Sequence, residues 1–389
     1  MQENSITTAS RFLSQIRKKN VVYITVKNKD YIRTSQIRHI LEENSAFFRI
    51  YSSEKSNPVS RALDLRCRIS SMDIREADVV IIGFLPQLLL KAVKKKIAGN
   101  DACYRNGAAI GDGSDACHKT FLVAEMFLSL YDTVISDRHL FADGGVLSHL
   151  LKRLDKMTIE AADLVVTDTK ANADYLSRLY DAGRDKFETL YLEADKEIYG
   201  ATYSSSSLNV LYFGSGLPLQ GTDIVLDAFA MAAGKNVSCT NNCYGNADSG
   251  IEDHSPRYIT CTYVGSTKEI PRKILDKARS NPYIEIIPWL PQNLLAKKIA
   301  QADLCIAGHF NPNIGKADRT IPGKAYIYEA MNKKMILGDT TANHEIFVED
   351  NRHFFVKRGD PQKLADAIAE FIKDNSDNNQ EISQADAKL

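Results

Sequence analysis

The stretch VLYFGSGLPLQGTDIVLDAFAMAA, from Val210 to Ala233, indicates the class of fold. It opens with an apolar run, residues 210–214, of the β-branched and aromatic type that forms buried strands. A glycine-rich loop follows, and residues 222–233 then show helical periodicity behind a capping residue, Thr222 or Asp223. A strand that leads through such a loop into a helix is the repeating unit of doubly wound α/β proteins.

Similar units recur along the whole chain. Short apolar runs predict further strands at 20–26, 47–52, 77–84, 120–125, 162–169, 258–265, 284–290, 302–309 and 335–339. Helical patterns predict helices at 35–44, 145–161, 271–280, 291–301 and 361–374. The helix at 145–161 carries an apolar row of Val146, Leu150, Leu154 and Met157 along one face. This alternation predicts parallel sheets with helices on both sides.

The pattern lapses once, in the polar, serine-rich segment 193–209, which is typical of a linker. We therefore expect a Rossmann-like acceptor-binding domain at 1–203, a Rossmann-like donor-binding domain at 204–375 and a polar tail at 376–389. Residues 235–257 fit no element and resemble an insertion. Ligands of open parallel sheets bind beyond the carboxyl ends of the strands, so we expect the site in a cleft between two such domains.

Composition restricts the class of protein. The 389 residues are 44% hydrophobic and 25% charged with no net charge, which is typical of a globular protein and argues against a nucleic-acid partner. Residues 1–100 hold 18 Lys and Arg against 9 Asp and Glu. That excess predicts either solvated surface lysines or a basic face toward a membrane surface or an anionic acceptor.

The scattered cysteines and the shortness of the apolar runs predict a location. Seven cysteines without a zinc-like spacing are typical of reduced thiols, although Cys239 and Cys243 lie four residues apart. The most apolar run, residues 79–90, contains a proline and is too short to span a bilayer. We therefore expect a cytoplasmic protein that can lie at the inner face of the cell membrane.

A second stretch, KADRTIPGKAYIYEAMNKKMILGDTTANHEI (316–346), contains the candidate ligand-binding residues. Pro322 suits a first helical turn, and the helix after it directs unpaired N–H groups toward Arg319 and Lys324. Such a group of cations and N–H donors can hold a diphosphate, and Glu329 can accept from the two vicinal hydroxyls of a ribose. The alternative is that these residues are solvated charges or an internal salt bridge.

The loop of the first stretch fits the same ligand. Gly214, Gly216 and Gly221 let backbone N–H groups approach an anion closely. The loop has neither the G-K-[ST] of a P-loop nor the G-x-G-x-x-G spacing of a dinucleotide site.

Taken in order, FGSGLPLQGTDIVLDAFA, IAQADLCIAG and RTIPGKAYIYEAMNKKMILGDTTANHEIF resemble glycosyltransferase family 4. YIRTSQIRHIL, EMFLSLYDTVISDR and ADLVVTDTKANADYLSRLY are similar to acceptor-domain segments of one bacterial branch. The resemblance implies an α/β protein of the GT-B fold, with two facing Rossmann-like doubly wound domains. It also implies a retaining, metal-independent transferase with a nucleotide-sugar as co-substrate and no other cofactor. The acceptor would be a glycan, a lipid-linked molecule or a protein, in surface polysaccharide or glycoconjugate synthesis.

The resemblance also suggests donor contacts. Glu329 matches the second glutamate of the family's E-x7-E motif, which binds the donor ribose, and Ile321 replaces the first glutamate. Ser215 and Gln220 stand where the family has an arginine and a lysine that hold the diphosphate. The cations would then have moved to Arg319 and Lys324. The expected donor site comprises Gly214, Ser215, Gly216, Gln220, Arg319, Lys324 and Glu329, with Lys324 also neutralising the leaving group.

Acceptor contacts are expected in the first domain. Glu125 ends a predicted strand and Asp132 follows it, so both can orient an acceptor, although Asp132 can equally cap the next segment. Arg33 and Arg38 can meet an anionic acceptor, and Arg38 can equally be a helix-surface residue. No protein nucleophile is required in the front-face mechanism usually described for the family.

Other chemistries find less support. GDGSD (111–115) reads as a surface turn rather than a metal-binding carboxylate pair, and His118, His139 and His309 have no partners that form a hydrolase triad. The first alternative function is another GT-B enzyme, such as a sugar-nucleotide epimerase or a phosphorylase. The second is a non-catalytic GT-B module that binds sugar or a partner. An NAD oxidoreductase is disfavoured because no glycine fingerprint follows residues 21–26.

Overall fold

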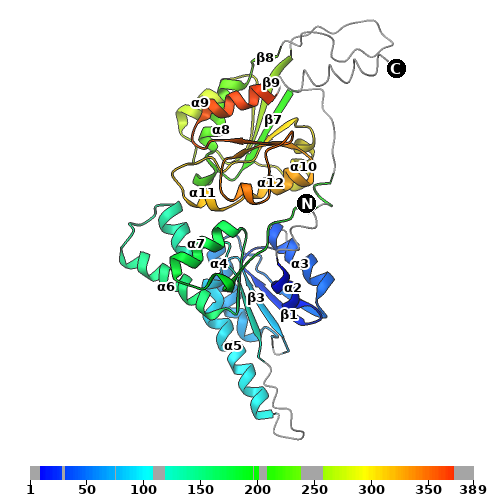
Figure 1. Cartoon of the computed structure of the whole chain (residues 1–389), viewed down its shortest axis with the longest axis vertical. Helices are drawn as coiled ribbons and strands as arrows, with labels where there is room; N and C mark the ends of the chain where they lie inside the picture. Colours follow the sequence, from blue (N-terminus) through cyan, green and yellow to red (C-terminus); the bar gives the residue numbers. More distant parts are fainter. Residues whose placement is uncertain are drawn as a thin grey trace, which may run out of the picture. The chain divides into compact units, whose positions relative to one another are not determined.

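The computed structural model describes residues 9–28, 31–74, 76–107, 119–195, 197–200, 208–237 and 257–371. The chain divides into two compact units, Met1–Asp195 and Lys196–Leu389, and each is built on a parallel sheet (Figure 1).

The sheet of the first unit has the strand order β2-β1-β3-β4-β5-β6 and is parallel throughout. Its strands are β1 (Asn20–Thr25), β2 (Phe47–Tyr51), β3 (Val79–Gly83), β4 (Phe121–Glu125), β5 (Leu164–Thr167) and β6 (Phe187–Thr189). The inner strands are buried along almost their whole length because helices cover both faces of the sheet.

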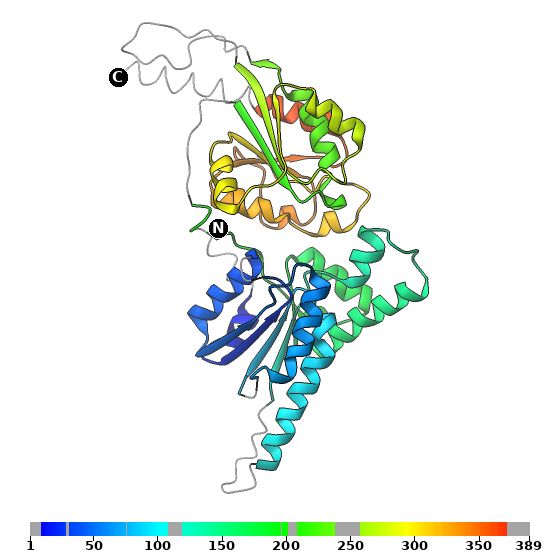
Figure 2. The same ribbon diagram turned by 180° about the vertical axis from the view of Figure 1, so that it is seen from behind.

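The helices of the first unit are α2 (Ser10–Ile16), α3 (Ile32–Asn44), α4 (Pro58–Arg68), α5 (Pro86–Gly107), α6 (Val146–Ala161) and α7 (Lys170–Tyr180). One side of the sheet packs against α4 and α5 and the other against α2 and α3, each pair with its own apolar core. Figure 2 shows α5 as the long cyan helix along the first of these faces. A six-residue π-helical segment, η2 (Asp132–Asp137), precedes α6.

The main path of the second sheet runs β10-β9-β7-β11-β12-β13. Its strands are β7 (Leu208–Gly214), β9 (Arg257–Gly265), β10 (Ile284–Ile287), β11 (Leu304–Ile306), β12 (Lys334–Gly338) and β13 (His353–Val356), all parallel, with β8 (Asn236–Val237) antiparallel to β9. The helices are α8 (Thr222–Ala232), α9 (Arg272–Arg279), α10 (Gln292–Ala300), α11 (Lys316–Arg319), α12 (Gly323–Ala330) and residues 361–371, and a 3₁₀ turn, η4 (Pro218–Gln220), precedes α8.

Numbered within the second unit, this order is 3-2-1-4-5-6, that of a dinucleotide-binding sheet. The direction of winding reverses between its first and fourth strands, β7 and β11. The loops that leave the carboxyl ends of these two strands therefore diverge, and the crevice between them is where open α/β sheets bind ligands.

The structure confirms every strand and helix named from the sequence, with shifted ends. Three strands, β6, β8 and β13, and four helices, α2, α4, α5 and α7, were not predicted, and β8 lies in the segment that resembles an insertion. The view that residues 235–257 hold no element is thus wrong at both ends. Residues 238–256, the tail 376–389, the turn 111–115, His118 and residues 201–207 of the expected linker lie outside the described residues.

Helix α6 exists as expected, but its apolar row does not face the core. Val146 is 90% exposed, Leu150 50% and Met157 46%. Across the parts of the chain that the structure describes, none of the helices has both the length and the apolarity needed to cross a bilayer.

Candidate functional site

The amine of Lys324 lies beside Gly214, at the reversal point of the second sheet. Its Nζ is 3.4 Å from the place that a Cβ on Gly214 would take, and 4.0 Å from the ring centroid of Tyr212. Lys324 is 5% exposed, and no described residue accepts a hydrogen bond from its Nζ. Burial lowers the pKa of Lys324 to about 7, because a buried ammonium without an anion is unfavourable. An anion at this position would satisfy it.

The glycine-rich loop is fixed on the same side of the sheet. Gly216 and Gly221 have φ values of +75° and +61°, which favour glycine. The N–H of Gly216 donates to Oε1 of Gln220 (3.2 Å), and Nε2 of Gln220 donates to Oγ of Ser215 (3.4 Å). Four of the expected donor residues, Gly214, Ser215, Gly216 and Gln220, therefore form one turn next to Lys324.

The loop after β11 closes against this turn. The N–H of Phe310 donates to the main-chain oxygen of Gln220 (3.2 Å), and Nδ2 of Asn311 donates to the oxygen of Pro218 (3.0 Å). A Cβ on Gly221 would lie 2.9 Å from the N of Asn311, so only glycine allows this approach. The two diverging loops are thus held in one arrangement before any ligand binds.

Sequence reasoning missed a histidine with cations around it. His309 is 7% exposed, and its Nδ1 lies 3.4 Å from Oγ1 of Thr320. Burial, together with the nearby charges of Lys324, Lys316 and Arg358, lowers the pKa of His309 to about 3. The crevice is therefore electropositive around a neutral imidazole. Lys316 could have indicated this group of cations, because it belongs to the same basic stretch as Lys324, but the sequence analysis assigns it no role.

The start of α12 borders the same crevice. Pro322 occupies the N-cap position, and no side chain of the described residues caps this end of the helix. A Cβ on Gly323 would have no neighbour within 4 Å, so the first turn is open on that side. The positive end of the helix and the amine of Lys324 can therefore act on one anion.

Glu329 does not join this group. Its Oε2 accepts from Nη2 of Arg352 (2.8 Å) and lies 2.9 Å from Nε2 of His353, whose Nδ1 is 3.1 Å from Oδ1 of Asp350. His353 begins β13, so this network lies at the amino end of the strands, whereas Gly214 lies at a carboxyl end. Arg319 ends α11 half-buried, with Nη1 folded back toward Gly315.

In the first unit, the structure joins two of the expected acceptor residues to each other. Nε of Arg33 lies 2.8 Å from Oε1 of Glu125, and their side chains are 1% and 2% exposed. The guanidinium also donates to the main-chain oxygens of Leu190 and Tyr191, and Tyr23 Oη donates to Oε2 of Glu125 (3.2 Å). Burial raises the pKa of Glu125, and Arg33 and Tyr23 oppose that rise.

The remaining two expected acceptor residues differ in exposure. Asp132 opens η2, is 3% exposed and accepts from Oη of Tyr175 (3.4 Å). Arg38 lies on α3 with its side chain 47% exposed, and its Nε is 3.9 Å from Oε1 of Glu42. Arg38 is therefore a helix-surface residue in this structure.

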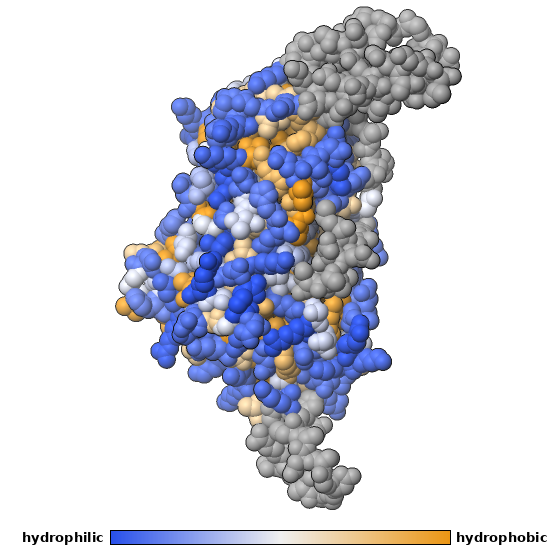
Figure 3. Space-filling model, viewed as in Figure 1, coloured by the Kyte–Doolittle hydropathy of each residue, from blue (hydrophilic) through white to orange (hydrophobic). Residues whose placement is uncertain are grey.

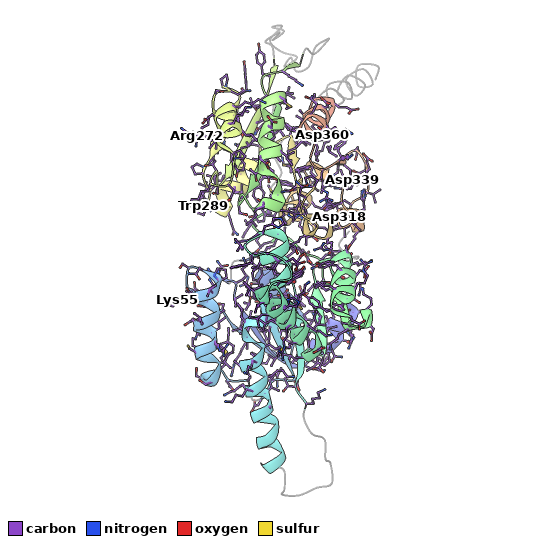
Figure 4. The ribbon with its side chains drawn as sticks, turned by 90° about the vertical axis from the view of Figure 1, so that its left-hand side faces the viewer. Lys55, Arg272, Trp289, Asp318, Asp339 and Asp360 are labelled. Atoms are coloured by element: carbon purple, nitrogen blue, oxygen red, sulfur yellow. The ribbon has the colours of Figure 1, made fainter. Side chains whose placement is uncertain are left out.

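A pocket of about 510 Å³ opens at the carboxyl ends of β9 and β10. It is lined by Gly265, Ser266, Thr267, Lys268, Arg279, Ile284, Ile286 and Pro288. Trp289 follows Pro288 and is 73% exposed, and Figure 4 shows it on the opposite side of the second unit from Asp318. Across the described residues, no three His, Cys, Asp or Glu side chains gather as metal ligands.

No protein-family model matches the sequence, and no curated protein sequence matches it. Solved structures do resemble the chain. HepE of Anabaena, in complex with UDP and glucose, has a TM-score of 0.54 at 12% identity, over 95% of this chain and 100% of that one. Sucrose-phosphate synthase of Thermosynechococcus elongatus has a TM-score of 0.59 at 10% identity, over 94% of both chains. A glycosyltransferase of Rickettsia africae has a TM-score of 0.52 at 10% identity, over 94% and 93%. At these identities the likeness concerns the fold, and it confirms the expected GT-B class of two Rossmann-like units.

Proposed function

We propose that this chain is a retaining glycosyltransferase of the family 4 type that takes its sugar from a UDP-sugar. One observation carries the proposal: the amine of Lys324 is buried, lacks an acceptor among the described residues and lies against Gly214 at the reversal point of the second sheet. A diphosphate placed there would meet this amine and the positive end of α12.

The rest of the donor fits the same edge of the sheet. The turn of Gly214, Ser215 and Gly216 lies beside the amine of Lys324, so the diphosphate would pack against it, and the pocket at the ends of β9 and β10 has room for the nucleoside. The structure of HepE with UDP-glucose supports the choice of uridine among nucleotides. The ammonium of Lys324 would neutralise the negative charge of the departing UDP, so the proposal assigns no step to a metal ion.

The acceptor contacts are proposed for the first unit. Glu125 and Asp132 are buried at the carboxyl end of β4 and just beyond it, so they would orient an acceptor hydroxyl through the side chains that they hold in place. Arg33 acts by holding Glu125. A glycan, a lipid-linked molecule or a protein of the cell surface pathway remains the proposed acceptor class, and the proposed location is cytoplasmic.

A thermal-shift screen tests the donor assignment first. UDP should raise the melting temperature more than GDP, ADP or CMP, because a ligand that binds only the folded state stabilises it. A panel of UDP-sugars is then assayed for release of UDP, with Lys324→Met as the variant that should lose at least about tenfold in kcat/KM. Failure of every nucleotide to shift the melting temperature would reject the proposal.

One observation favours a second candidate, a GT-B module that binds without turnover. Ile321 replaces a glutamate of the family motif and is 5% exposed, so it offers no polar contact to a sugar. Binding of UDP with no hydrolysis or transfer from any UDP-sugar would support this candidate over the enzyme.

A further inference from the structure

A group of large apolar side chains is exposed on the first unit, around the start of α6. We call this group the α6 face. Its members, with their exposed fractions, are Leu140 (59%), Phe141 (54%), Val146 (90%), Leu150 (50%) and Met157 (46%). Single exposed apolar residues are ordinary on protein surfaces, but a contiguous group marks an interaction site. Figure 3 shows apolar side chains at the left-hand edge of the view, where α6 begins, with hydrophilic side chains beside them.

The orientation of α6 is fixed by polar contacts on its inner side. Asp155 is fully buried and accepts from Oγ of Ser129 (2.7 Å), Oη of Tyr180 (2.9 Å) and Nε2 of Gln87 (2.6 Å). It also accepts the N–H groups of Leu130 and Tyr131, each at 3.0 Å. Rolling the helix to bury its apolar row would break all of these bonds, so the row stays outside.

The loop that carries Leu140 and Phe141 is also anchored. Asp143 accepts from Oη of Tyr131 (3.1 Å) and from Oγ of Ser148 (2.8 Å), and Nζ of Lys152 lies 3.7 Å from it. Nζ of Lys152 lies in turn 4.1 Å from the ring centroid of Tyr131. These contacts hold the loop in place, and the side chains of Leu140 and Phe141 remain exposed to solvent.

Basic side chains flank the apolar row. At about 100° per residue, Val146, Leu150 and Met157 form one row along α6. The row next to it consists of exposed His149, Arg153, Lys156 and Glu160, with Nζ of Lys156 3.9 Å from Oε1 of Glu160. Arg138 and Lys152 add two cations, against two exposed carboxylates, those of Asp143 and Glu160. An apolar row beside a basic one is the arrangement of helices that lie in the headgroup region of a bilayer.

We propose that the α6 face docks on a membrane surface that contains anionic lipids, with its apolar row in the interface and its basic row on the headgroups. The proposal goes beyond the proposed transfer reaction and does not depend on it. It also differs from the sequence-based expectation, which placed membrane contact on the basic residues 1–100. A second copy of the chain is the competing occupant of this face.

Vesicle co-sedimentation of the full chain tests the proposal. Two vesicle types are compared, phosphatidylcholine alone and phosphatidylcholine with about 30% phosphatidylglycerol. The chain should bind the anionic vesicles more tightly, and added salt should weaken that binding. The double variant Val146→Ser/Leu150→Ser should lower the partition coefficient by about tenfold or more. Arg153→Gln should reduce the preference for anionic vesicles while retaining most of the binding to neutral ones.

Helix α4 offers a matched control. Val59 and Leu63 are 65% and 59% exposed at the same four-residue spacing, so Val59→Ser/Leu63→Ser removes a similar exposed apolar surface elsewhere on the unit. This variant should bind as the wild type does. Circular dichroism and melting temperatures show that the variants fold, and Val146→Ser alone serves if the double variant does not.

Three results would overturn the proposal. The wild-type chain could fail to bind anionic vesicles, or the α4 and α6 variants could lose binding equally. The chain could also be a dimer by light scattering that Val146→Ser/Leu150→Ser converts to a monomer, without vesicle binding by either form. That last result would assign the α6 face to a second copy.

Discussion

Lys324 and Tyr212 form a contact that connects stability to function: the ammonium lies 4.0 Å from the ring centroid, and no described residue offers it an anion. The ring compensates part of the loss of water around the charge. The remaining cost persists in the free protein and is relieved when an anion binds. Sites that bind charged ligands often destabilise the empty protein for this reason.

Lys324→Met should therefore raise the melting temperature by several degrees while weakening UDP binding by about tenfold or more. Lys333 is the matched control, because it is equally buried but its Nζ donates to the main-chain oxygens of Ala300 and Ala302. Lys333→Met should lower the melting temperature and leave UDP affinity unchanged. Calorimetry and UDP titration measure both quantities. A loss of stability in Lys324→Met would contradict the account.

The lowered pKa of Lys324 sets a pH dependence. The folded state releases this proton at about pH 7 and the unfolded chain near the ordinary value of 10.5. Between these values the unfolded state holds more protons, so stability rises with pH from about 7 to 10.5 and is lowest below 7. Denaturation at a series of pH values should show this slope in the wild type and its absence in Lys324→Met.

The same proton should affect ligand binding. UDP favours the charged amine, so its affinity should fall as pH rises above about 7. Titration calorimetry in buffers of different ionisation enthalpy would then show proton uptake near pH 8. Lys324→Arg keeps a charge at all these values and should abolish the uptake. Equal proton uptake in the wild type and in Lys324→Arg would show that another group is responsible.

Gly214→Ala should weaken UDP binding with little loss of stability. The new Cβ would lie 2.7 Å from Oε1 of Gln220, 3.3 Å from Oη of Tyr212 and 3.4 Å from Nζ of Lys324, and the side chains of Gln220 and Lys324 can move away from it. Gly145→Ala in the first unit is the control, because a Cβ there meets only the main-chain oxygen of Ala142, at an ordinary contact distance of 3.5 Å. It should bind UDP as the wild type does. Equal weakening by the two variants would argue against the loop as the diphosphate site.

The buried pair of Arg33 and Glu125 should show strong coupling in a double-mutant cycle. Glu125→Leu leaves a buried guanidinium without its counter-charge and should cost about 3–5 kcal/mol in the free energy of unfolding. Arg33→Met/Glu125→Leu should cost less than the sum of the two single variants. Urea unfolding supplies the three values. Additive costs would show that the two side chains do not stabilise each other.

The network of Glu329 and His353 should contribute most to stability in mildly acidic solution. Burial alone would lower the pKa of His353, but the hydrogen bond to Glu329 raises it, so this contribution is lost as pH rises beyond the pKa of the folded state. Burial alone would raise the pKa of Glu329, but His353 and Arg352 lower it, so that contribution is lost as pH falls. The stabilising contributions of His353 and Glu329 are therefore both fully present between about pH 4.5 and 6.5.

Glu329→Gln should therefore destabilise the protein more at pH 5.5 than at pH 8.5, by about 1–3 kcal/mol at the lower pH. The exposed Glu349, replaced in the same way, is the control and should have little effect at either pH. Thermal unfolding of the wild type and of both variants at the two pH values tests this expectation. If Glu329 binds a ribose instead, Glu329→Gln should weaken UDP binding with no such dependence of stability on pH.

The amino-acid sequence was enough to predict the alternation of strands and helices, although not α2, α4, α5 or α7, and to propose an anion site near Lys324. Runs such as residues 79–83 form strands because a β-branched apolar segment is stable only between two covered faces of a sheet. Gly214, Gly216 and Lys324 could be named in advance because glycine conformation, side-chain charge and helix ends are local properties.

Which charged side chains pair with each other depends on the tertiary structure. Arg33 and Glu125 pair because α3 and β4 bring them together, Glu329 meets His353 because β13 lies beside β12, and the apolar row of α6 faces outward because Asp155 holds the other side of the helix. Periodicity records which residues share a face. It does not record what that face packs against, since burial and pairing depend on strand order and on partners distant in the chain.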